Sequence, residues 1–335
     1  MEKYEPLPLG SSENQQSLLE SQSVTQPVRD DYLRRSRLFV TWAANAALEV
    51  GRYPLLELAI LEYFDEMFFE GRSAEDGEKL WASLKFFDPG LGRRGDHLFP
   101  RVLRALKGWH RLCPAMTRQP LPWLGLLAIV AYLLSQGSVE HALALILQFT
   151  LYLRPGELCE LRVGQVVAPI GRGALWGFIV RPFLTEDSRP GKTGEFDESL
   201  LLDDPRLAFL APFLLCLTQG RPATDPLFSF DVRGLTESLR TTLQALKMEH
   251  MGVELYSLRH GGASDDFLTK RRTLPEIKHR GRWRADSSVR RYTKSARALK
   301  ELEKIPQGAL AVAMALDLDL SLYFNRPSLV PPILV

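Results

Sequence analysis

The spacing of hydrophobic residues predicts a small helical module in the first third of the chain. Phe39, Trp42, Ala43, Ala46 and Ala47 recur at i, i+3, i+4, i+7 and i+8, which places them on one face of an α-helix. Similar patterns cover Leu55–Tyr63, Glu78–Phe87 and Phe99–Trp109. We therefore expect an all-helical domain over residues 36–116.

A second domain is expected over residues 120–305, after a linker at Thr117–Pro122 that holds two prolines. Its pattern begins with two helices and then changes to short runs typical of strands. The predicted fold is thus mainly α with a small antiparallel β-sheet. The helices are Leu124–Ser135, Val139–Tyr152 and a late one at Ser288–Lys304, and the strands are Gln165–Ile170, Leu175–Pro182 and Ser199–Leu202.

The two ends of the chain differ in composition. Residues 1–35 are rich in Ser, Gln and Glu with little hydrophobic periodicity, so they predict a disordered tail. Residues 306–335 form a C-terminal helix or tail, in which the apolar stretch Ala309–Tyr323 precedes a proline-rich end.

Positive charge is concentrated near the end of the second domain. The whole chain of 335 residues has a formal net charge of only +2, but Lys270–Lys300 holds twelve Lys/Arg against Glu276 and Asp286, or 12 − 2 = +10. Such a block favours a polyanion partner. A solvated helix face is the alternative interpretation.

Several classes of protein are disfavoured. The three cysteines are far apart and odd in number, so neither a metal site nor a disulfide framework is expected, and a reducing compartment fits. The longest apolar run, Leu121–Leu134, is shorter than the roughly 20 residues that cross a bilayer, so no membrane partner is expected. No secretion signal opens the chain.

Three segments carry residues suited to phosphodiester chemistry. They are Leu151-Tyr-Leu-Arg-Pro-Gly-Glu-Leu-Cys-Glu-Leu161, Leu255-Tyr-Ser-Leu-Arg-His-Gly-Gly-Ala263 and Arg280-Gly-Arg-Trp-Arg-Ala-Asp-Ser-Ser-Val-Arg-Arg-Tyr292. Arginine suits a phosphate because its planar fork donates two parallel hydrogen bonds and keeps its charge. A tyrosine nucleophile can form a covalent intermediate that divides one difficult step into two.

In order and spacing, these segments resemble the catalytic pattern of the tyrosine recombinases, the phage integrase family. Arg154 matches the Arg of an Arg-x-x-Glu-Leu segment, and Arg259 matches the second Arg. Trp283 lies nine residues before Tyr292, and Lys192 lies in a turn between the two arginines. The resemblance covers about residues 120–305, and the helical module before it is similar to the family's core-binding (SAM-like) domain.

The resemblance implies a site-specific recombinase or integrase that cuts and rejoins double-stranded DNA through a 3′-phosphotyrosyl intermediate. Tyr292 would be the nucleophile, Arg154 and Arg259 would grip the phosphate, Lys192 would protonate the leaving 5′ oxygen, and Trp283 would pack beside them. No cofactor and no metal is implied. The family works as a homo-tetramer on DNA, with two domains clamping the duplex, which points to an intracellular protein on DNA (nuclear in a eukaryote). In the family a C-terminal helix often docks on a neighbouring copy, so the resemblance implies that Ala309–Tyr323 either does the same, which we favour slightly, or folds back on its own domain. The expected DNA-backbone contacts are Arg280, Arg282, Arg284, Arg290, Arg291 and Lys294.

One position departs from the family pattern. Where the family has His or Lys, three residues before the second Arg, this chain has Tyr256, a poor base at neutral pH. His260 is a candidate substitute, or the two arginines lower the pKa of the Tyr292 hydroxyl. The sequence leaves both open.

Each of these residues also has a purely structural interpretation. Arg154 and Arg259 could be surface residues at helix ends, Lys192 an exposed turn lysine, and Trp283 and Tyr292 core residues.

Two alternative functions follow from the pattern. One is a catalytically inactive DNA-binding relative from a mobile element, which Tyr256 favours, and the other is a type IB topoisomerase.

Overall fold

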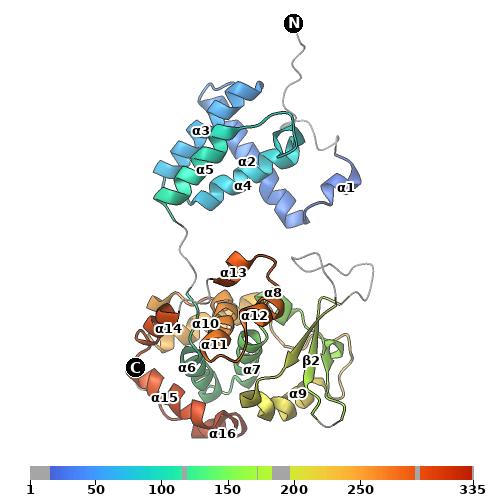
Figure 1. The fold of residues 1–335 in the computed structure, drawn as a ribbon, viewed down its shortest axis with the longest axis vertical. Coiled ribbons are helices and arrows are strands. Elements are labelled where there is room, and N and C mark those ends of the chain that lie inside the picture. The colour runs from blue at the N-terminus through green and yellow to red at the C-terminus, as the bar shows by residue number, and fades with distance from the viewer. Residues whose placement is uncertain (1–15, 115–118, 172, 183–196, 291–294, 334–335) are drawn as a thin grey trace. The chain divides into compact units, whose positions relative to one another are not determined.

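The computed structural model describes residues 16–114, 119–171, 173–182, 197–290 and 295–333, and it divides the chain into two compact units, Met1–Thr117 and Arg118–Val335 (Figure 1). The division falls at the start of the predicted linker. Among the described residues the structure is mainly helical with one small antiparallel sheet, which confirms the predicted fold class. None of the described helices has both the length and the apolar character needed to cross a membrane.

Unit 1 is a helical domain whose apolar faces meet in one core. Phe39, Ile60, Phe64, Trp81 and Trp109 are buried there, one or two from each long helix. The proline at the start of α3 and of α5 suits the first helical turn, where a missing N–H costs nothing. The elements are α1 (Leu18–Ser21), α2 (Gln26–Asn45), α3 (Tyr53–Phe69), α4 (Ala74–Phe87), η3 (Pro89–Leu91) and α5 (Pro100–Leu112).

The first long helix corrects the predicted extent of the disordered tail. The prediction places residues 1–35 in the tail, whereas α2 already begins at Gln26. Its first half is held by polar contacts: Arg35 bridges Asp31 at 2.7 Å and Asp76 at 3.2 Å, and the buried Ser36 hydroxyl bonds Ser83. Hydrophobic periodicity could not reveal this part of the helix because its anchors are polar.

Unit 2 is built around two helices that are buried along most of their length, α6 (Trp123–Ser135) and α7 (Val139–Thr150). In Figure 1 they occupy the centre of the unit, and the sheet lies at one side. The other described helices are α8 (Pro155–Cys159), η4 (Val163–Gln165), η5 (Pro205–Leu210), α9 (Ala211–Thr218), α10 (Val232–Ala245), η6 (Glu249–Met251), α11 (Leu255–Leu268), α12 (Leu274–Arg280), α13 (Asp286–Arg290), α14 (Ser295–Leu302), α15 (Gln307–Leu318), α16 (Leu320–Asn325) and η8 (Pro327–Leu329).

The sheet has the order β1-β2-β3, with β1 (Val166–Val167), β2 (Trp176–Val180) and β3 (Glu198–Leu202) all antiparallel to their neighbours. In the β2–β3 register, Phe178 faces Leu200 and Val180 faces Glu198. Side chains alternate across the sheet, so Phe178 and Leu200 turn into the core. Glu198, the first residue of β3, stands at the end nearest the candidate site.

Helix α11 approaches α7 closely because it carries two glycines. A Cβ on Gly262 would lie 1.9 Å from the Phe149 carbonyl oxygen, and one on Gly261 would lie 2.1 Å from the Leu121 carbonyl oxygen. Any larger residue would push the helices apart. Arg259, two residues earlier on α11, is therefore held against the end of α7.

The C-terminal segment packs on its own domain. Helix α15 lies along α6, where it buries Ala309, Val312, Ala313 and Leu316. We slightly favour docking of Ala309–Tyr323 on a neighbouring copy, but in the structure this segment packs on its own domain instead. Part of the predicted helix Ser288–Lys304 is described: α13 reaches Arg290 and α14 covers Ser295–Leu302, while residues 291–294 lie outside the described residues.

Candidate active site

The first predicted arginine stands at the N-terminus of a short helix. Arg154 is the N-cap residue of α8, and Pro155 occupies the first helical position. The Arg154 main-chain N–H donates to Glu157 Oε2 at 2.8 Å, and its guanidinium pairs with Oε1 of the same carboxylate. Glu157 is only 4% exposed, so Arg154 is fixed to a carboxylate inside the domain.

The second arginine reaches the same place from α11. Arg259 is 2% exposed, and its guanidinium donates to the main-chain carbonyls of Tyr152 and Gly281. Its Nη1 lies 3.9 Å from Glu157 Oε2. Buried guanidinium groups are stable only when their donors are satisfied, and here three residues from two of the motif segments supply the partners.

Trp283 closes one side of the cluster. The Arg259 Cζ atom lies 4.9 Å from the Trp283 ring centroid, which is within the range of a cation–π contact. Gly281 is required beneath the indole, because a Cβ there would lie 1.9 Å from Trp283 Cζ3. The structure thus brings Arg154, Arg259 and Trp283 together, although they lie in three separate segments of the sequence.

The main-chain carbonyl of Tyr152 links two arginines. Tyr152 has a φ of +51°, a left-handed conformation directly after α7, and its carbonyl accepts from both Arg259 and Arg282. Its hydroxyl donates to Asp266 inside the domain. Burial, reinforced by the Asp266 carboxylate, holds the pKa of the Tyr152 hydroxyl far above its ordinary value, so this tyrosine stays neutral.

Glu157 is the carboxylate on which the arginines converge. Burial raises its pKa, but the charges of Arg282 and Arg154 and the Arg154 N–H outweigh burial, so its pKa lies below the ordinary value. Glu157 is therefore ionised at neutral pH. The sequence did not single it out as a site residue, although it is the Glu of the Arg-x-x-Glu-Leu segment on which the resemblance rests.

Tyr256, at the position of the family's His or Lys, and its candidate substitute His260 lie on the same face of α11 as Arg259. Tyr256, Arg259 and His260 follow i, i+3 and i+4 spacing, which places them on neighbouring positions of one helix face. Tyr256 is 36% exposed and His260 is half-buried. Tyr256 also lines a groove of about 670 Å³ together with Pro155 and Gly156 of α8.

Two of the predicted DNA contacts point into the protein. Arg280 is 8% exposed and donates to the carbonyls of Thr150 and Leu201, both at 3.0 Å. The Arg282 side chain is 6% exposed and pairs with Glu157 and Glu198. Their partners are buried or half-buried groups from distant segments, which the sequence does not reveal, so neither guanidinium is on the surface.

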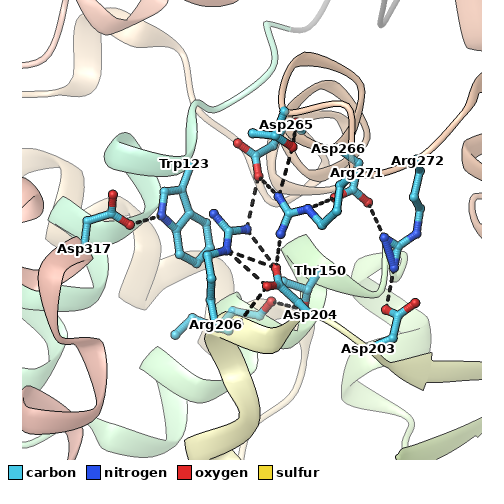
Figure 2. A network of polar contacts seen from close by, with 12 residues as sticks. Trp123, Thr150, Asp203, Asp204, Arg206, Asp265, Asp266, Arg271, Arg272 and Asp317 are labelled. Atoms are coloured by element: carbon cyan, nitrogen blue, oxygen red, sulfur yellow. Dashed lines mark hydrogen bonds and ion pairs between the residues drawn. The ribbon is translucent and has the colours of Figure 1, made fainter.

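Other arginines of the basic block are also used internally (Figure 2). Arg271, together with Arg206 from outside the block, reaches the carboxylates of Asp204 and Asp265, and Arg271 also pairs with Asp266. Figure 2 shows Arg272 continuing the chain of contacts to Asp203. The formal charge of the Lys270–Lys300 block therefore overstates the charge that it presents to a partner.

Arg284 and Arg290 remain exposed. Arg284 borders a groove of about 690 Å³ between the start of β3 and α12, and Lys278 and His279 line the same groove. Lys278 is paired there with Asp286 at 2.5 Å. Arg284, Lys278 and His279 thus lie in the groove that Trp283 also lines, at the edge of the arginine cluster.

Four predicted residues lie outside the described part of the chain. They are Tyr292, Lys192, Arg291 and Lys294. Within the described residues, no group of three His, Cys, Asp or Glu side chains is placed to bind a metal ion.

The fold was compared with known proteins. Neither a family model nor a curated protein sequence matches the chain. Among solved structures, it is similar to a lambda integrase dimer bound to a COC′ core site (15% identity over 83% of this chain and 75% of that chain, TM-score 0.53). It is also similar to a XerH site-specific recombinase bound to palindromic difH substrate in a post-cleavage complex (12%, 82% and 79%, TM-score 0.55).

A third similar structure is the Tn1549 transposon integrase in complex with transposon right end DNA (13% identity over 85% of this chain and 98% of that chain, TM-score 0.56). At such low identity the likeness concerns the fold. It was found independently of the motifs, and it agrees with them. The chain therefore has the fold of the tyrosine recombinases, to which these three proteins belong.

Proposed function

We propose that the protein is a site-specific DNA recombinase or integrase that cuts and rejoins double-stranded DNA through a phosphotyrosine. The observation that carries the proposal is the meeting of Arg154 and Arg259 at Glu157, with Trp283 against Arg259. Each was assigned from its motif alone, and a chance set of motif matches would have no reason to converge in space.

In the proposed reaction, the Tyr292 oxygen attacks the scissile phosphorus and gives its proton to His260 or to water, and the P–O5′ bond breaks. Lys192 gives a proton to the departing 5′ oxygen. A 5′ hydroxyl from a second strand then attacks the phosphotyrosine, which releases Tyr292 and restores a phosphodiester. The bond energy is conserved in the intermediate, so the scheme needs no nucleoside triphosphate.

Arg154 and Arg259 stabilise the charge on the non-bridging oxygens. A unit charge about 4 Å from a phosphate oxygen contributes about 4 kcal/mol at an effective dielectric near 20, before desolvation. Because Glu157 and the Tyr152 carbonyl hold the two side chains before substrate arrives, little reorganisation is needed at the moment of reaction.

Unit 1 supplies a second surface suited to DNA. The exposed face of α5 carries Arg101, Arg104, Lys107 and Arg111, and α5 contains no acidic residue. These four lie opposite the buried Val102, Leu106 and Trp109. Such a ridge matches the phosphates of a duplex, and with the exposed Arg284 and Arg290 it is our candidate for backbone contact. Assembly as a tetramer on DNA is part of the same proposal and rests on the resemblance.

A second candidate is a relative that binds DNA without cutting it. The observation that favours it is Tyr256, which occupies the position where the family has His or Lys. A tyrosine hydroxyl is neutral at physiological pH and accepts a proton poorly.

The deciding experiment looks for the covalent bond. The protein is incubated with a pool of nicked, randomised duplexes and digested, and the Tyr292 peptide is searched by mass spectrometry for a nucleotide adduct. Tyr292→Phe removes the nucleophile, and Tyr323→Phe, on α16, is the matched control. We expect the adduct in the wild type and in Tyr323→Phe but not in Tyr292→Phe.

DNA binding without an adduct would support the binding-only candidate. Relaxation of plasmid without joining of separate duplexes would instead indicate a topoisomerase. An adduct that survives in Tyr292→Phe would show that another residue is the nucleophile.

A further inference from the structure

Arg282 occupies a backbone position that normally belongs to glycine. Helix α12 ends in a Schellman motif: the Trp283 N–H bonds the Lys278 carbonyl at 3.1 Å and the Arg282 N–H bonds the His279 carbonyl at 2.9 Å. In this motif the residue after the C-cap adopts a left-handed backbone conformation, and Arg282 does so with a φ of +53°. Because a Cβ is disfavoured there, glycine is the usual occupant.

The side chain of Arg282 explains why an arginine stands there. It is almost fully buried, and Nη2 lies 2.6 Å from Glu157 Oε2 while Nη1 lies 3.0 Å from Glu198 Oε2. Nη2 also donates to the Tyr152 carbonyl at 3.4 Å. Only a forked, permanently charged side chain reaches two carboxylates at once. Residues held in a disfavoured conformation by such contacts are often functional.

The contact with Glu157 places Arg282 directly behind the phosphate-binding arginines. Glu157 Oε2 also accepts the Arg154 main-chain N–H and lies 3.9 Å from Arg259 Nη1. Its other oxygen holds the Arg154 guanidinium. The orientation of this one carboxylate therefore sets where Arg154 points, and Arg282 is the strongest charged contact that fixes it apart from Arg154 itself.

The contact with Glu198 joins the arginine cluster to the sheet. Glu198 is the first residue of β3, and its side chain is 12% exposed. Arg282 thus connects three segments, which are the N-terminus of α8, the carbonyl that follows α7 and the start of β3. Its loss would remove one positive charge from between two carboxylates that are both largely shielded from water.

We propose that Arg282 is a positioning residue, which orients Glu157, and through it Arg154, toward the scissile phosphate without touching the DNA itself. The inference rests on the proposed function for its role in catalysis. The pairing within the protein stands apart from that function and can be tested apart from it.

The chain offers a matched control. Lys270 occupies the same position in a second Schellman motif at the end of α11, with a φ of +56° and the Arg271 N–H bonded to the Asp266 carbonyl at 2.9 Å. Its side chain is exposed. Replacement by glycine removes the unfavourable combination of a Cβ with a positive φ at both positions, but only Arg282→Gly removes contacts to carboxylates.

The experiment compares wild type, Arg282→Gly, Arg282→Lys and Lys270→Gly. The first readout does not need activity: arginines are modified with phenylglyoxal, and the peptide with Arg154 is quantified by mass spectrometry. We expect Arg154 to react at least fivefold faster in Arg282→Gly than in the wild type, with Arg282→Lys between them and Lys270→Gly unchanged. Equal rates in all four proteins would overturn the inference, whether or not the protein cuts DNA.

The second readout is cleavage. We expect the single-turnover rate of adduct formation to fall at least tenfold in Arg282→Gly, with the affinity for duplex DNA within about threefold of the wild type. A large loss of affinity with an unchanged rate would instead make Arg282 a direct DNA contact. In a double-mutant cycle with Glu157→Gln, the two losses should not add, because both act through one carboxylate.

The two proposals fail in different ways. If the wild type forms no adduct, the proposed function fails and the phenylglyoxal result alone decides the positioning role. If the wild type is active and Arg282→Gly cleaves as fast as Lys270→Gly, the proposed function stands and the inference about Arg282 is wrong.

Discussion

The guanidinium of Arg259 lies over the indole ring of Trp283, with 4.9 Å between its Cζ atom and the ring centroid. The same guanidinium donates to two main-chain carbonyls, so the ring covers one face of a charge that the protein already holds in place. Trp283 also lies 6.0 Å from the Tyr152 ring, which keeps the indole in place. We therefore expect Trp283 to hold the Arg259 guanidinium in place and to stabilise its charge, which can be measured.

Replacement of Trp283 by alanine should slow adduct formation by about tenfold or more, because a partly desolvated cation–π contact contributes roughly 1–2 kcal/mol. Trp283→Phe keeps a ring and should retain most of the rate. The measurement is single-turnover cleavage of a trapped duplex. Trp176→Phe, in β2, is the control for the loss of an indole away from the site, and equal rates in Trp283→Ala and Trp176→Phe would contradict the prediction.

Glu157→Gln should destabilise unit 2, because it leaves buried arginines without their carboxylate. Breaking a buried ion pair typically costs about 3 kcal/mol or more. For a unit of this size that corresponds to a drop of roughly 10 °C in the unfolding midpoint. Thermal unfolding by circular dichroism measures it, and Glu303→Gln, at an exposed position, should leave the midpoint unchanged.

The same carboxylate predicts a dependence of stability on pH. The pKa of Glu157 is lower in the folded protein than its ordinary value, and so is the pKa of Asp204, where contacts with Arg206 and Arg271 outweigh burial. The unfolded chain therefore binds more protons in acid. The two ionised carboxylates contribute fully to the stability of the folded protein above the unfolded pKa, near pH 4.3. This contribution is lost as the pH falls through their pKa values in the folded protein. Unfolding midpoints measured from pH 6 to pH 3 should fall less steeply in Glu157→Gln.

Leu316→Ala should destabilise unit 2 by about 3 kcal/mol, because the leucine is fully buried between α15 and α6. Met314→Ala, on the same helix but 56% exposed, is the control and should change little. Urea unfolding of the two variants measures the difference. If Leu316→Ala were neutral, helix α15 would not be held against its own domain in solution.

The basic ridge of α5 should contribute to DNA affinity through counterion release. Removing Arg104 or Lys107 should weaken binding to any duplex sequence and reduce the slope of log affinity against log salt by about one per residue. Fluorescence anisotropy at several salt concentrations measures this. Lys79→Ala removes an exposed lysine from α4 and should not alter the slope.

Much of the fold and part of the site could be predicted from the sequence. The buried helices α6 and α7 and the strands β2 and β3 lie close to their predicted bounds because their apolar runs are strong. Arg154, Arg259 and Trp283 could be found because they belong to motifs with fixed spacing. Each of these signals is local in the chain.

The burial of individual site residues and the start of α2 depend on contacts with residues that are distant in the sequence. Arg282 and Arg284 are two residues apart and chemically identical, yet the side chain of Arg282 is only 6% exposed whereas Arg284 is exposed. What separates them is the presence of Glu157 and Glu198 beside the first, which no local pattern reveals. The early start of α2 has the same cause, since Ser36 and Ser83 pair across two helices.

The packing of α15 on α6 determines when unit 2 can become complete during synthesis. Helix α6 is among the first parts of the unit to leave the ribosome, and ten of its thirteen residues are buried in the finished protein. Asp317 of α15, which accepts the Trp123 indole N–H at 2.6 Å, follows 194 residues later in the chain. Helices α7, α10 and α11 can cover other sides of α6 as they are made, but the side that α15 covers stays exposed to water until almost the whole unit has been translated.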